Sequence, residues 1–476
     1  MTDRTAHRYE DGPTPCAPTS PVIRSIQRQI RTAGAVSQAE VRLATAMGLV
    51  SADSIHPPGF NDGLVAPPLP VLRQLGIRPR ALRAPQRRRT LHAIALLVDF
   101  SDNKGSRSPA EFKRLLFDPR NSRSMTSYYR DLSKGALRVT GEVSRWIRAP
   151  RPYGFYTAGQ SGTGLSYPQN TPGLLFDALT EFTRMDDLRR FDLDGDGLVD
   201  GIFLIHAGGG AEAEPDPAKR SEMIWSHKWV LPRPFVEDGV SVFAYSTEPE
   251  DGRVGVFCHE FGHVLGLPDL YDTTYRSRGI GDWCLMAGGS WGGGGHQPVR
   301  MSAWCLARLG WITPRRITRA RTATMPTLAR RKTACYRLWT GRAEGPESFL
   351  IENRQATGMD AALPGSGLAV WHVDERQSGN TNPLSFLVGL VQADGRRDLE
   401  VNRNSGDPGD LFPGSRGVTA LDDGTTPSTR ANDGRPSEVA LSGIAETGGK
   451  IRLTVRVSAA PARPTRARRA RRRGRR

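Results

Sequence analysis

Residues 91–250 switch repeatedly between strand-like and helix-like patterns of apolar positions. The segments 91–100 (LHAIALLVDF) and 201–208 (GIFLIHAG) are apolar runs of strand length, which predicts two buried strands. Between them, the capping box SPAE opens a predicted helix at 108–116, and a second helix with an apolar stripe is predicted over 171–182. This alternation is typical of a mixed α/β or α+β domain.

The apolar pattern is different in two other places. LRVTGEV at 137–143 alternates apolar and polar residues, which predicts a hairpin strand. From about residue 313, short strand patterns such as SFLIENR, GLAVWHVD and KIRLTVRV alternate with turn residues, which is typical of a β-sandwich. The fold class that we predict is therefore α+β, with a β-sandwich-like C-terminal domain.

The stretch from residue 255 to 272 reads GVFCHEFGHVLGLPDLYD and contains the motif H-E-x-x-H as His259, Glu260 and His263. A helix turns about 100° per residue, so histidines four apart share one face and can both bind a metal ion. A catalytic zinc needs three protein ligands and one open position. The motif supplies only two, and by itself it also arises in ordinary helices, where a histidine is simply a satisfied polar group.

Residues after the motif supply the missing ligand. Gly266 can end the helix in a left-handed conformation, and Asp269 would then return toward the metal. The full pattern H-E-x-x-H-x-x-G-x-x-D has metzincin spacing, with aspartate in place of a third histidine. Met286, in the Gly-rich GDWCLMAGGSW, is similar to the methionine of a metzincin Met-turn, although a core methionine would serve the same packing role.

Several segments together resemble the immune inhibitor A family of secreted bacterial metalloproteases. The resemblance is carried by FCHEFGHVLGLPDLYD, GDWCLMAGGSW and MSAWCLARLGW, with SMTSYYRDLSKGALRVTGEV, IWSHKW, FLIENRQ and LPGSGLAVWHVDE around them, and it covers about residues 91–457. It implies a zinc endopeptidase that cleaves proteins or peptides. The implied zinc ligands are His259, His263 and Asp269, with Glu260 as the general base.

With this resemblance, the chain divides into four predicted parts. Residues 1–89 are similar to a pro-region, 90–312 form a metzincin-like zinc-peptidase domain, 313–458 are the β-rich domain and 459–476 are a disordered Arg-rich tail. Residues 1–89 contain two short helical patterns, a Pro-rich stretch and a basic run at Arg87–Arg89. That run is either a processing site or an arginine-rich linker of no consequence.

Secretion is expected from the family, but no signal peptide is visible, because the first residues are polar and Pro-rich. We favour a different start or another export route over the third alternative, a protein that stays inside the cell. No run reaches the roughly 18 apolar residues of a membrane span.

The formal charge of +17 is largely a property of the C-terminal tail. Nine arginines lie between Arg463 and Arg476, which leaves +8 for the rest of the chain. A run of like charges without apolar periodicity predicts non-specific, salt-dependent contact with anionic surfaces, and no specific nucleic-acid partner. The alternative function is a catalytically silent binding protein of the same fold that uses this tail. The sequence does not predict an oligomeric state.

FDLDGDGLVDG resembles a calcium-binding loop. Asp192, Asp194, Asp196 and Asp200 have the spacing of oxygen ligands, and Gly197 permits a sharp turn. No glutamate follows at the twelfth position, so a standalone calcium loop is expected rather than an EF-hand; the alternative is a solvated acidic turn.

A second acidic group is spaced irregularly, which leaves a further calcium site and a solvated loop equally open. It consists of Asp394, Asp398, Asp407 and Asp410.

The five cysteines contain no C-x-x-C pair, so a structural zinc site is not expected. Cys284 and Cys305 flank the same predicted core and are expected to bridge, with buried thiols as the alternative. Cys258 is expected to be a packing residue. Cys16, among prolines in the pro-region, is a candidate latency ligand, because a thiolate bound at the open zinc position would displace water. His372 lies in a strand pattern and is expected to be structural.

Overall fold

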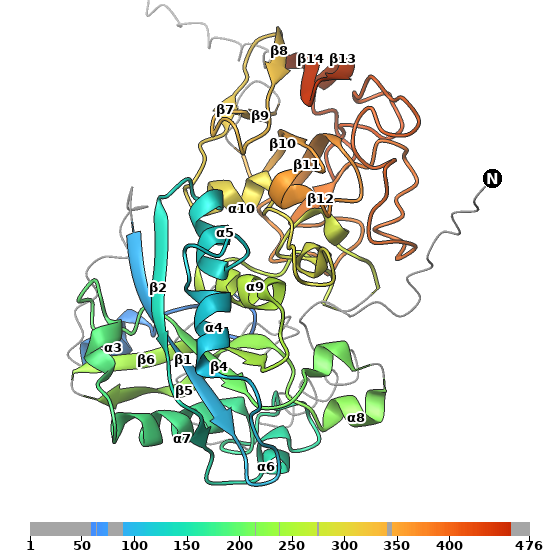
Figure 1. The fold of residues 1–476 in the computed structure, drawn as a ribbon. Coiled ribbons are helices and arrows are strands. Elements are labelled where there is room, and N and C mark those ends of the chain that lie inside the picture. Colours follow the sequence, from blue (N-terminus) through green and yellow to red (C-terminus); the bar gives the residue numbers. More distant parts are fainter. Residues whose placement is uncertain are drawn as a thin grey trace, which may run out of the picture.

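The computed structural model describes residues 59–62, 64–74, 89–214, 216–237, 239–273, 276–339 and 345–457, and it confirms a mixed α/β protein (Figure 1). The predictions for Cys16, for most of the pro-region and for the Arg-rich tail lie outside the described residues. Arg89 is described, and it is the first residue of strand β1 (Arg89–Asp99).

The first sheet has the strand order β2-β1-β4-β6-β5, with the short β3 also paired to β1. Its other strands are β2 (Leu137–Val143), β3 (Ile147–Arg148), β4 (Ile202–His206), β5 (His227–Glu237) and β6 (Val240–Pro249). All neighbours are parallel except β5, which runs antiparallel to β6 at the edge.

The predicted hairpin at 137–143 is wrong. This segment is β2, which runs parallel to β1. The chain between β1 and β2 forms helices α4 (Pro109–Leu116) and α5 (Met125–Leu132), and such a crossover connects parallel strands. The alternation of apolar and polar residues in β2 reflects its position at the sheet edge, where one face is partly exposed.

Helices cover both faces of this sheet, which explains the continuous apolar runs of its central strands. Ala93, Ala95 and Leu97 of β1 pack in one core with α4, α5 and α9 (Val254–Val264), whereas the intervening Leu96 packs in a second core with α7 (Thr171–Thr183). The remaining α-helices are α3 (Leu69–Gln74), α6 (Tyr153–Thr157), α8 (Pro217–Ser221) and α10 (Ala303–Arg308). Short 3-10 helices are η2 (Leu188–Phe191), η3 (Ala211–Ala213), η4 (Gly281–Trp283), η5 (Gly288–Trp291) and η6 (Gly358–Asp360).

Two further sheets follow in the C-terminal part (Figure 1). One has the order β12-β11-β10-β9-β7 and the other β13-β14-β8. Their strands are β7 (Arg315–Arg316), β8 (Arg321–Met325), β9 (Cys335–Leu338), β10 (Glu347–Arg354), β11 (Gly367–Asp374), β12 (Val388–Leu390), β13 (Val439–Thr447) and β14 (Lys450–Val457). Ile351, Val370 and Leu453 lie in a core that the two sheets share.

The opposite face of the five-stranded sheet belongs to the same core as helix α9. Leu350 and Trp371 from this sheet lie in one apolar cluster with Phe261 of α9 and Met286. The predicted boundary at residue 312 therefore crosses a continuous hydrophobic core, so the C-terminal sheet helps to support the segment around Met286.

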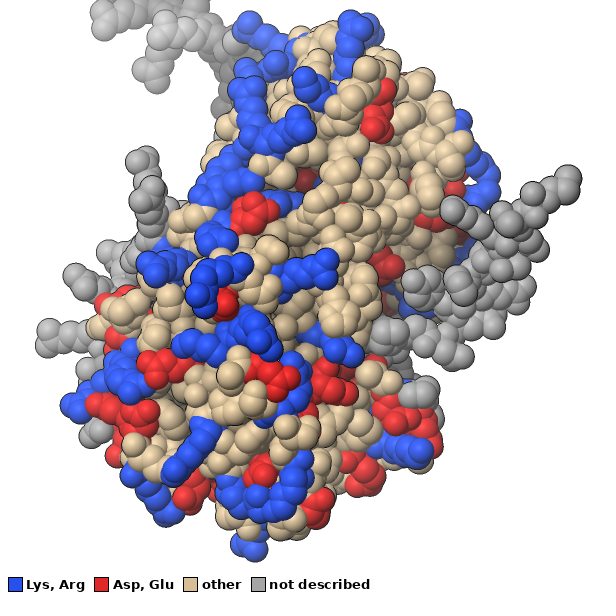
Figure 2. All heavy atoms as spheres, in the orientation of Figure 1, with Lys and Arg blue, Asp and Glu red and all other residues tan. Residues whose placement is uncertain are grey.

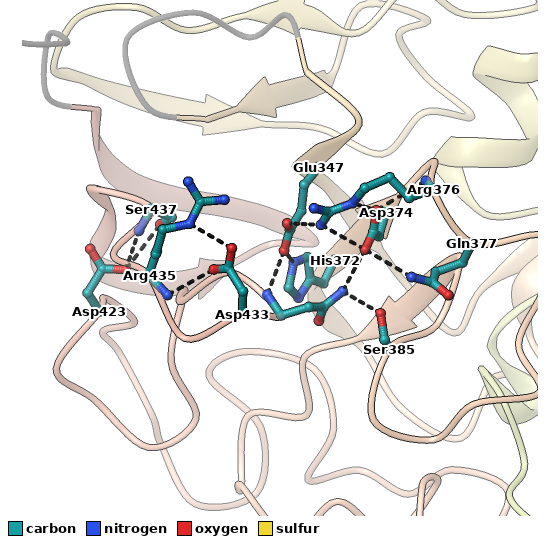
Figure 3. Close-up of polar contacts among 11 residues, drawn as sticks. Glu347, His372, Asp374, Arg376, Gln377, Ser385, Asp423, Asp433, Arg435 and Ser437 are labelled. Atoms are coloured by element: carbon teal, nitrogen blue, oxygen red, sulfur yellow. Dashed lines mark hydrogen bonds and ion pairs between the residues drawn. The ribbon is translucent and has the colours of Figure 1, made fainter.

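His372 lies in a network of polar side chains with Glu347, Asp374 and Arg376 (Figure 3). Its Nε2 lies 2.9 Å from Glu347 Oε1, and its ring packs on Phe349. Arg376 pairs with both Glu347 and Asp374, so two buried carboxylates are neutralised within one network. His372 is thus a partner of Glu347 and is not among the groups of described residues that could hold a metal.

Part of the predicted pro-region is bound to the edge strand of the first sheet. Lys228 of β5 is buried. Its Nζ donates to the carbonyl oxygens of Gly59 (3.1 Å) and of Leu64. It also donates to the carboxylate of Asp62 (3.2 Å). The Asn61 amide nitrogen also donates to the carbonyl of Lys228 (2.9 Å). Burial lowers the pKa of Lys228 to about 8, and Asp62 opposes this shift. Residues 59–62 and 64 therefore form a specific contact with the first sheet.

Candidate metal centre and active site

Helix α9 is buried from Val254 to His263, because it lies between the first sheet and the segment 284–295. Two glycines permit this close approach. A Cβ on Gly255 would lie 1.9 Å from the carbonyl oxygen of Ser290, and one on Gly262 would lie 2.4 Å from Met286 Sδ. The Met286 side chain thus packs directly against the turn of α9 that carries the H-E-x-x-H motif.

Three predicted ligands converge at the end of this helix. The Nε2 atoms of His259 and His263 are 3.2 Å apart, and Asp269 Oδ1 lies 3.1 Å from the first and 3.2 Å from the second. Tetrahedral zinc with bonds of about 2.0–2.1 Å places its ligand atoms about 3.3 Å apart. The three atoms therefore have the spacing that a zinc ion requires.

The second nitrogen of each histidine is fixed by a backbone carbonyl. His259 Nδ1 lies 2.8 Å from Leu285 O, and His263 Nδ1 lies 2.7 Å from Leu267 O. A carbonyl only accepts hydrogen bonds, so Nδ1 of each ring carries a hydrogen and Nε2 is the ring nitrogen that faces the centre. Metal-binding histidines are oriented in this way.

Gly266 and Asp269 lie where the sequence places them. Gly266 follows the last turn of α9 with φ of +92°, and its amide donates to His263 O (2.9 Å). Leu270 N then donates to Met286 O (2.7 Å), which fixes the residue after Asp269 beside the Met286 segment. The left-handed glycine thus turns the chain so that Asp269 faces both histidines.

The environment of Asp269 favours its charged form. Burial alone would raise the pKa of Asp269, but the imidazoles of His263 and His259 outweigh burial and hold this pKa well below its usual value. The other carboxylate oxygen, Oδ2, is buried without a hydrogen-bond partner among the described residues. A charged carboxylate and two imidazole Nε2 atoms directed at one point fit a divalent metal ion.

Glu260 is buried on α9, next to His259 in sequence. Helix α5 supports this part of α9: Tyr129 OH donates to Cys258 O (2.5 Å), and the Tyr129 ring packs edge-on against Phe261. Glu260 therefore lies on a buried part of α9, on the helix that also carries His259 and His263.

Asn380 is a supporting residue that the sequence reasoning missed. It is buried, and its Nδ2 donates to Leu270 O (2.7 Å) and Val388 O (2.8 Å), which connects the loop after Asp269 to β12. Nothing in the local sequence signals this role, because the contact spans more than a hundred residues.

The acidic loop before β4 brings together three of its four predicted ligands. Oxygen atoms of Asp192, Asp194 and Asp196 lie within 4.8 Å of one another, and Asp194 Oδ1 is buried without a hydrogen-bond partner among the described residues. Asp200 is not in this group: its Oδ2 accepts from the His92 amide (2.7 Å) of β1, and burial raises its pKa to about 7. Sequence spacing alone does not distinguish the three clustered aspartates from Asp200, which binds the backbone of β1.

The cysteines Cys284 and Cys305 are adjacent, as predicted, but are present as thiols. Their Sγ atoms are 3.9 Å apart, whereas a disulfide bond is about 2.05 Å long. Cys258 is a buried free thiol with a pKa raised by burial, in agreement with a packing role.

Gly255→Ala should destabilise the protein, because the new methyl group would meet a backbone oxygen that cannot rotate away. Overpacking of this kind costs about 1–3 kcal/mol, which exceeds the gain of about 1 kcal/mol from alanine in a helix. Denaturant unfolding measures the effect. The matched control is Gly154→Ala in α6, where a Cβ meets nothing within 4 Å and only the propensity gain is expected. Equal stability changes in the two variants would show that α9 is not packed as described.

The described surface carries charges of both signs. On the face shown in Figure 2, Lys and Arg side chains are interspersed with Asp and Glu. Among the described helices, none is long and apolar enough to cross a membrane.

Part of the chain is similar to known metalloproteases. Residues 108–311 match the sequence profile of the immune inhibitor A peptidase M6 catalytic domain. The chain is 36% identical to Immune inhibitor A of Bacillus thuringiensis subsp. alesti over 206 residues, covering 37% of this chain and 30% of that protein. It is 31% identical to Pre-pro-metalloprotease PrtV of Vibrio cholerae serotype O1 (strain M66-2) over 271 residues, covering 46% of this chain and 29% of that protein. The matches thus span under a third of either relative. The profile match at 108–311 includes His259, His263 and Asp269. Residues 108–311 of this chain are therefore similar to the catalytic domain of the immune inhibitor A (M6) metalloproteases.

Proposed function

We propose that the chain is a zinc-dependent endopeptidase that cleaves peptide bonds in proteins or peptides. The observation that carries this proposal is the convergence of His259 Nε2, His263 Nε2 and Asp269 Oδ1, 3.1–3.2 Å apart, within the matched peptidase region. The same convergence supports a metzincin-like catalytic domain, together with the left-handed Gly266 and with Met286 packed beneath the helix. The two C-terminal sheets around one core support the β-sandwich-like second domain.

His259, His263 and Asp269 would hold the metal. When bound there, zinc lowers the pKa of a coordinated water to about 7 and polarises a carbonyl. The Glu260 carboxylate would take a proton from the attacking water as the oxygen adds to the peptide carbonyl carbon. It would then give this proton to the amine nitrogen as the C–N bond breaks, so that Glu260 ends the cycle unchanged.

The alternative, a silent binding protein of the same fold, makes a different prediction about the site. A protein that has lost catalysis has no need to retain the base together with a full set of ligands. Here Glu260, both histidines and Asp269 are all present, and each histidine has its orienting carbonyl. These features favour the enzyme.

The acidic loop is proposed to hold calcium through Asp192, Asp194 and Asp196. Their close oxygen atoms and the buried, unpartnered Asp194 Oδ1 support this. Because Asp200 binds the backbone of β1, it would position the loop rather than coordinate the ion. Such a calcium ion would have a structural role.

The proposed activity and its secreted setting follow from the family. The proposed substrates are proteins or peptides. The chain is proposed to act after export from the cell. A digest of an unfolded protein such as casein, with and without a zinc chelator, tests the activity. Fragments that appear only without chelator support the proposal, whereas no cleavage by the zinc-loaded chain, also after removal of residues 1–88, contradicts it.

Deletion of residues 463–476 should leave peptidase activity unchanged within about twofold, because the described site is complete without them. The same deletion should reduce binding to anionic lipid vesicles and make the remaining binding less salt-dependent, since basic side chains act by releasing counterions. Initial rates and vesicle sedimentation measure the two effects. A large loss of activity would instead assign this tail to the enzyme.

A further inference from the structure

The loop 283–300 carries two of the groups that support the proposed zinc centre. The carbonyl of Leu285 accepts from His259 Nδ1 (2.8 Å), and the Met286 side chain packs against Gly262 of α9. The only regular structure in this loop, all of which is described, is the end of η4 and the short η5. The position of the loop therefore depends on contacts with other parts of the chain.

A single guanidinium group binds both ends of this loop. It belongs to Arg354, the last residue of β10, in the segment FLIENRQ. Arg354 Nη1 donates to the carbonyl of Trp283 (2.9 Å), and Nη2 donates to the carbonyl of Arg300 (3.3 Å). Trp283 and Arg300 are the first and last residues of the loop. Arg354 therefore closes the base of the loop from the C-terminal sheet.

The guanidinium of Arg354 is buried, and each of its three nitrogens has an acceptor. The side chain is only 2% exposed. Asp360 accepts from Nη2 (2.9 Å) and from Nε (3.3 Å), and it also accepts from the Arg300 amide (2.8 Å). One carboxylate thus holds both the guanidinium and the far end of the loop. A buried ion pair of this kind keeps its geometry, because displacing either partner would leave an uncompensated buried charge.

Building on the proposed zinc site, we propose that Arg354 is a positioning residue of that site. By holding the base of the loop 283–300, it fixes the Leu285 carbonyl that orients His259. Trp283 precedes Leu285 by two residues, so a shift of the Trp283 carbonyl would move the Leu285 carbonyl and turn the His259 ring. Groups that orient a metal-binding histidine contribute roughly 10–100-fold to metal affinity or activity. Because Arg354 acts through the loop, we expect the lower end of that range.

Lysine at position 354 separates the charge of arginine from its geometry. Its ammonium can still pair with Asp360, but it is a compact point charge, whereas guanidinium is a rigid planar fork. An ammonium therefore cannot replace the contacts with Asp360, Trp283 and Arg300 at the same time. Arg354→Lys should keep the buried charge paired and loosen the base of the loop.

The experiment uses the full chain, loaded with zinc for kinetics and with cobalt for visible absorption, because cobalt bands report on the geometry of the metal ligands. Arg354→Lys should bind zinc about tenfold more weakly in competition with a zinc-binding dye, and its cobalt bands should shift. At saturating zinc, kcat for a quenched peptide should fall about tenfold, whereas KM should stay within about twofold, since a buried side chain does not touch the substrate.

Leu453→Ala is the matched control for a loss of stability. Leu453 is fully buried in the core between the two C-terminal sheets, and among the described residues this core includes neither α9 nor the loop 283–300. The truncation leaves a cavity and should lower the melting temperature. Zinc affinity, cobalt bands and kcat should nevertheless stay within about twofold of the wild type, measured well below the melting temperature.

Zinc affinity and cobalt bands of Arg354→Lys that match the wild type would overturn this role and leave the proposed function intact. Equal losses in Arg354→Lys and Leu453→Ala would also overturn it, because they would show a general effect of destabilisation. A wild-type chain that binds neither metal would overturn the proposed function itself.

If Arg354→Lys does not fold, Asp360→Asn is the second variant. It keeps an oxygen for the Arg300 amide but removes one of the two oxygens that hold Arg354. Its cobalt bands should shift away from those of the wild type, and unchanged bands would overturn the positioning role.

Discussion

Glu260→Gln should lower the rate of peptide hydrolysis by roughly 10²–10⁴-fold and leave zinc binding intact. Glutamine has nearly the same shape as glutamate, but its amide cannot take a proton from water at neutral pH. The three atoms that converge as ligands come from His259, His263 and Asp269, so the substitution removes none of them. Initial rates on a quenched peptide and zinc analysis of the same sample measure both effects.

A second buried glutamate provides the control. Glu352 Oε1 accepts hydrogen bonds from the Ala303 amide and Trp371 Nε1, both of which an amide oxygen can also accept. Glu352→Gln should therefore keep most of the activity. Full turnover by Glu260→Gln would exclude Glu260 as the base, and an equal loss in both variants would indicate a general effect of charge removal.

Asp269→Ala should lower zinc affinity by more than about a hundredfold, and activity should fall in proportion. Removing even a hydrogen-bond partner of a metal ligand commonly costs 10–100-fold in affinity, and Asp269 is proposed as a ligand itself. We expect this loss because Asp269 Oδ1 lies 3.1 Å from His259 Nε2 and 3.2 Å from His263 Nε2, where a third zinc ligand would lie. Competition with a zinc-binding dye measures the affinity.

Asp272→Asn is the matched control in the same loop. Asp272 is also buried, but its Oδ2 accepts from the Ser277 amide (3.0 Å) and hydroxyl (2.9 Å), which an asparagine oxygen can replace. Its zinc affinity should stay within about threefold of the wild type. If Asp269→Ala binds zinc as tightly as this control does, the third ligand lies elsewhere.

The parts of the site that could be predicted from sequence are local. His259, Glu260 and His263 share one helix, and Gly266 and Asp269 follow within six residues, so helix geometry and one left-handed turn determine where the side chains go. The buried strand at 91–100 was predictable for a similar reason, since an apolar run of that length has few alternatives.

The parts that could not be predicted depend on distant contacts. The pattern of β2 is the same for a hairpin strand and for a parallel edge strand, and only the position of α4 and α5 distinguishes them. Asp200 has calcium-loop spacing, but its carboxylate accepts a hydrogen bond from the His92 amide of the adjacent β1. Likewise, Asn380 supports the Asp269 loop only because the C-terminal sheet shares a core with α9.

The most direct test of the central claim is a zinc titration of the chelated full chain, processed at its basic run if required, with peptide cleavage followed at each step. The account predicts that activity is absent without zinc, rises in proportion to bound zinc and reaches its maximum at one zinc per chain at the His259, His263 and Asp269 site. In the Asp269→Ala variant, this rise should shift to much higher zinc concentrations. Cleavage that persists in the zinc-free chain, or a titration that Asp269→Ala does not alter, would contradict a zinc peptidase built on these three residues.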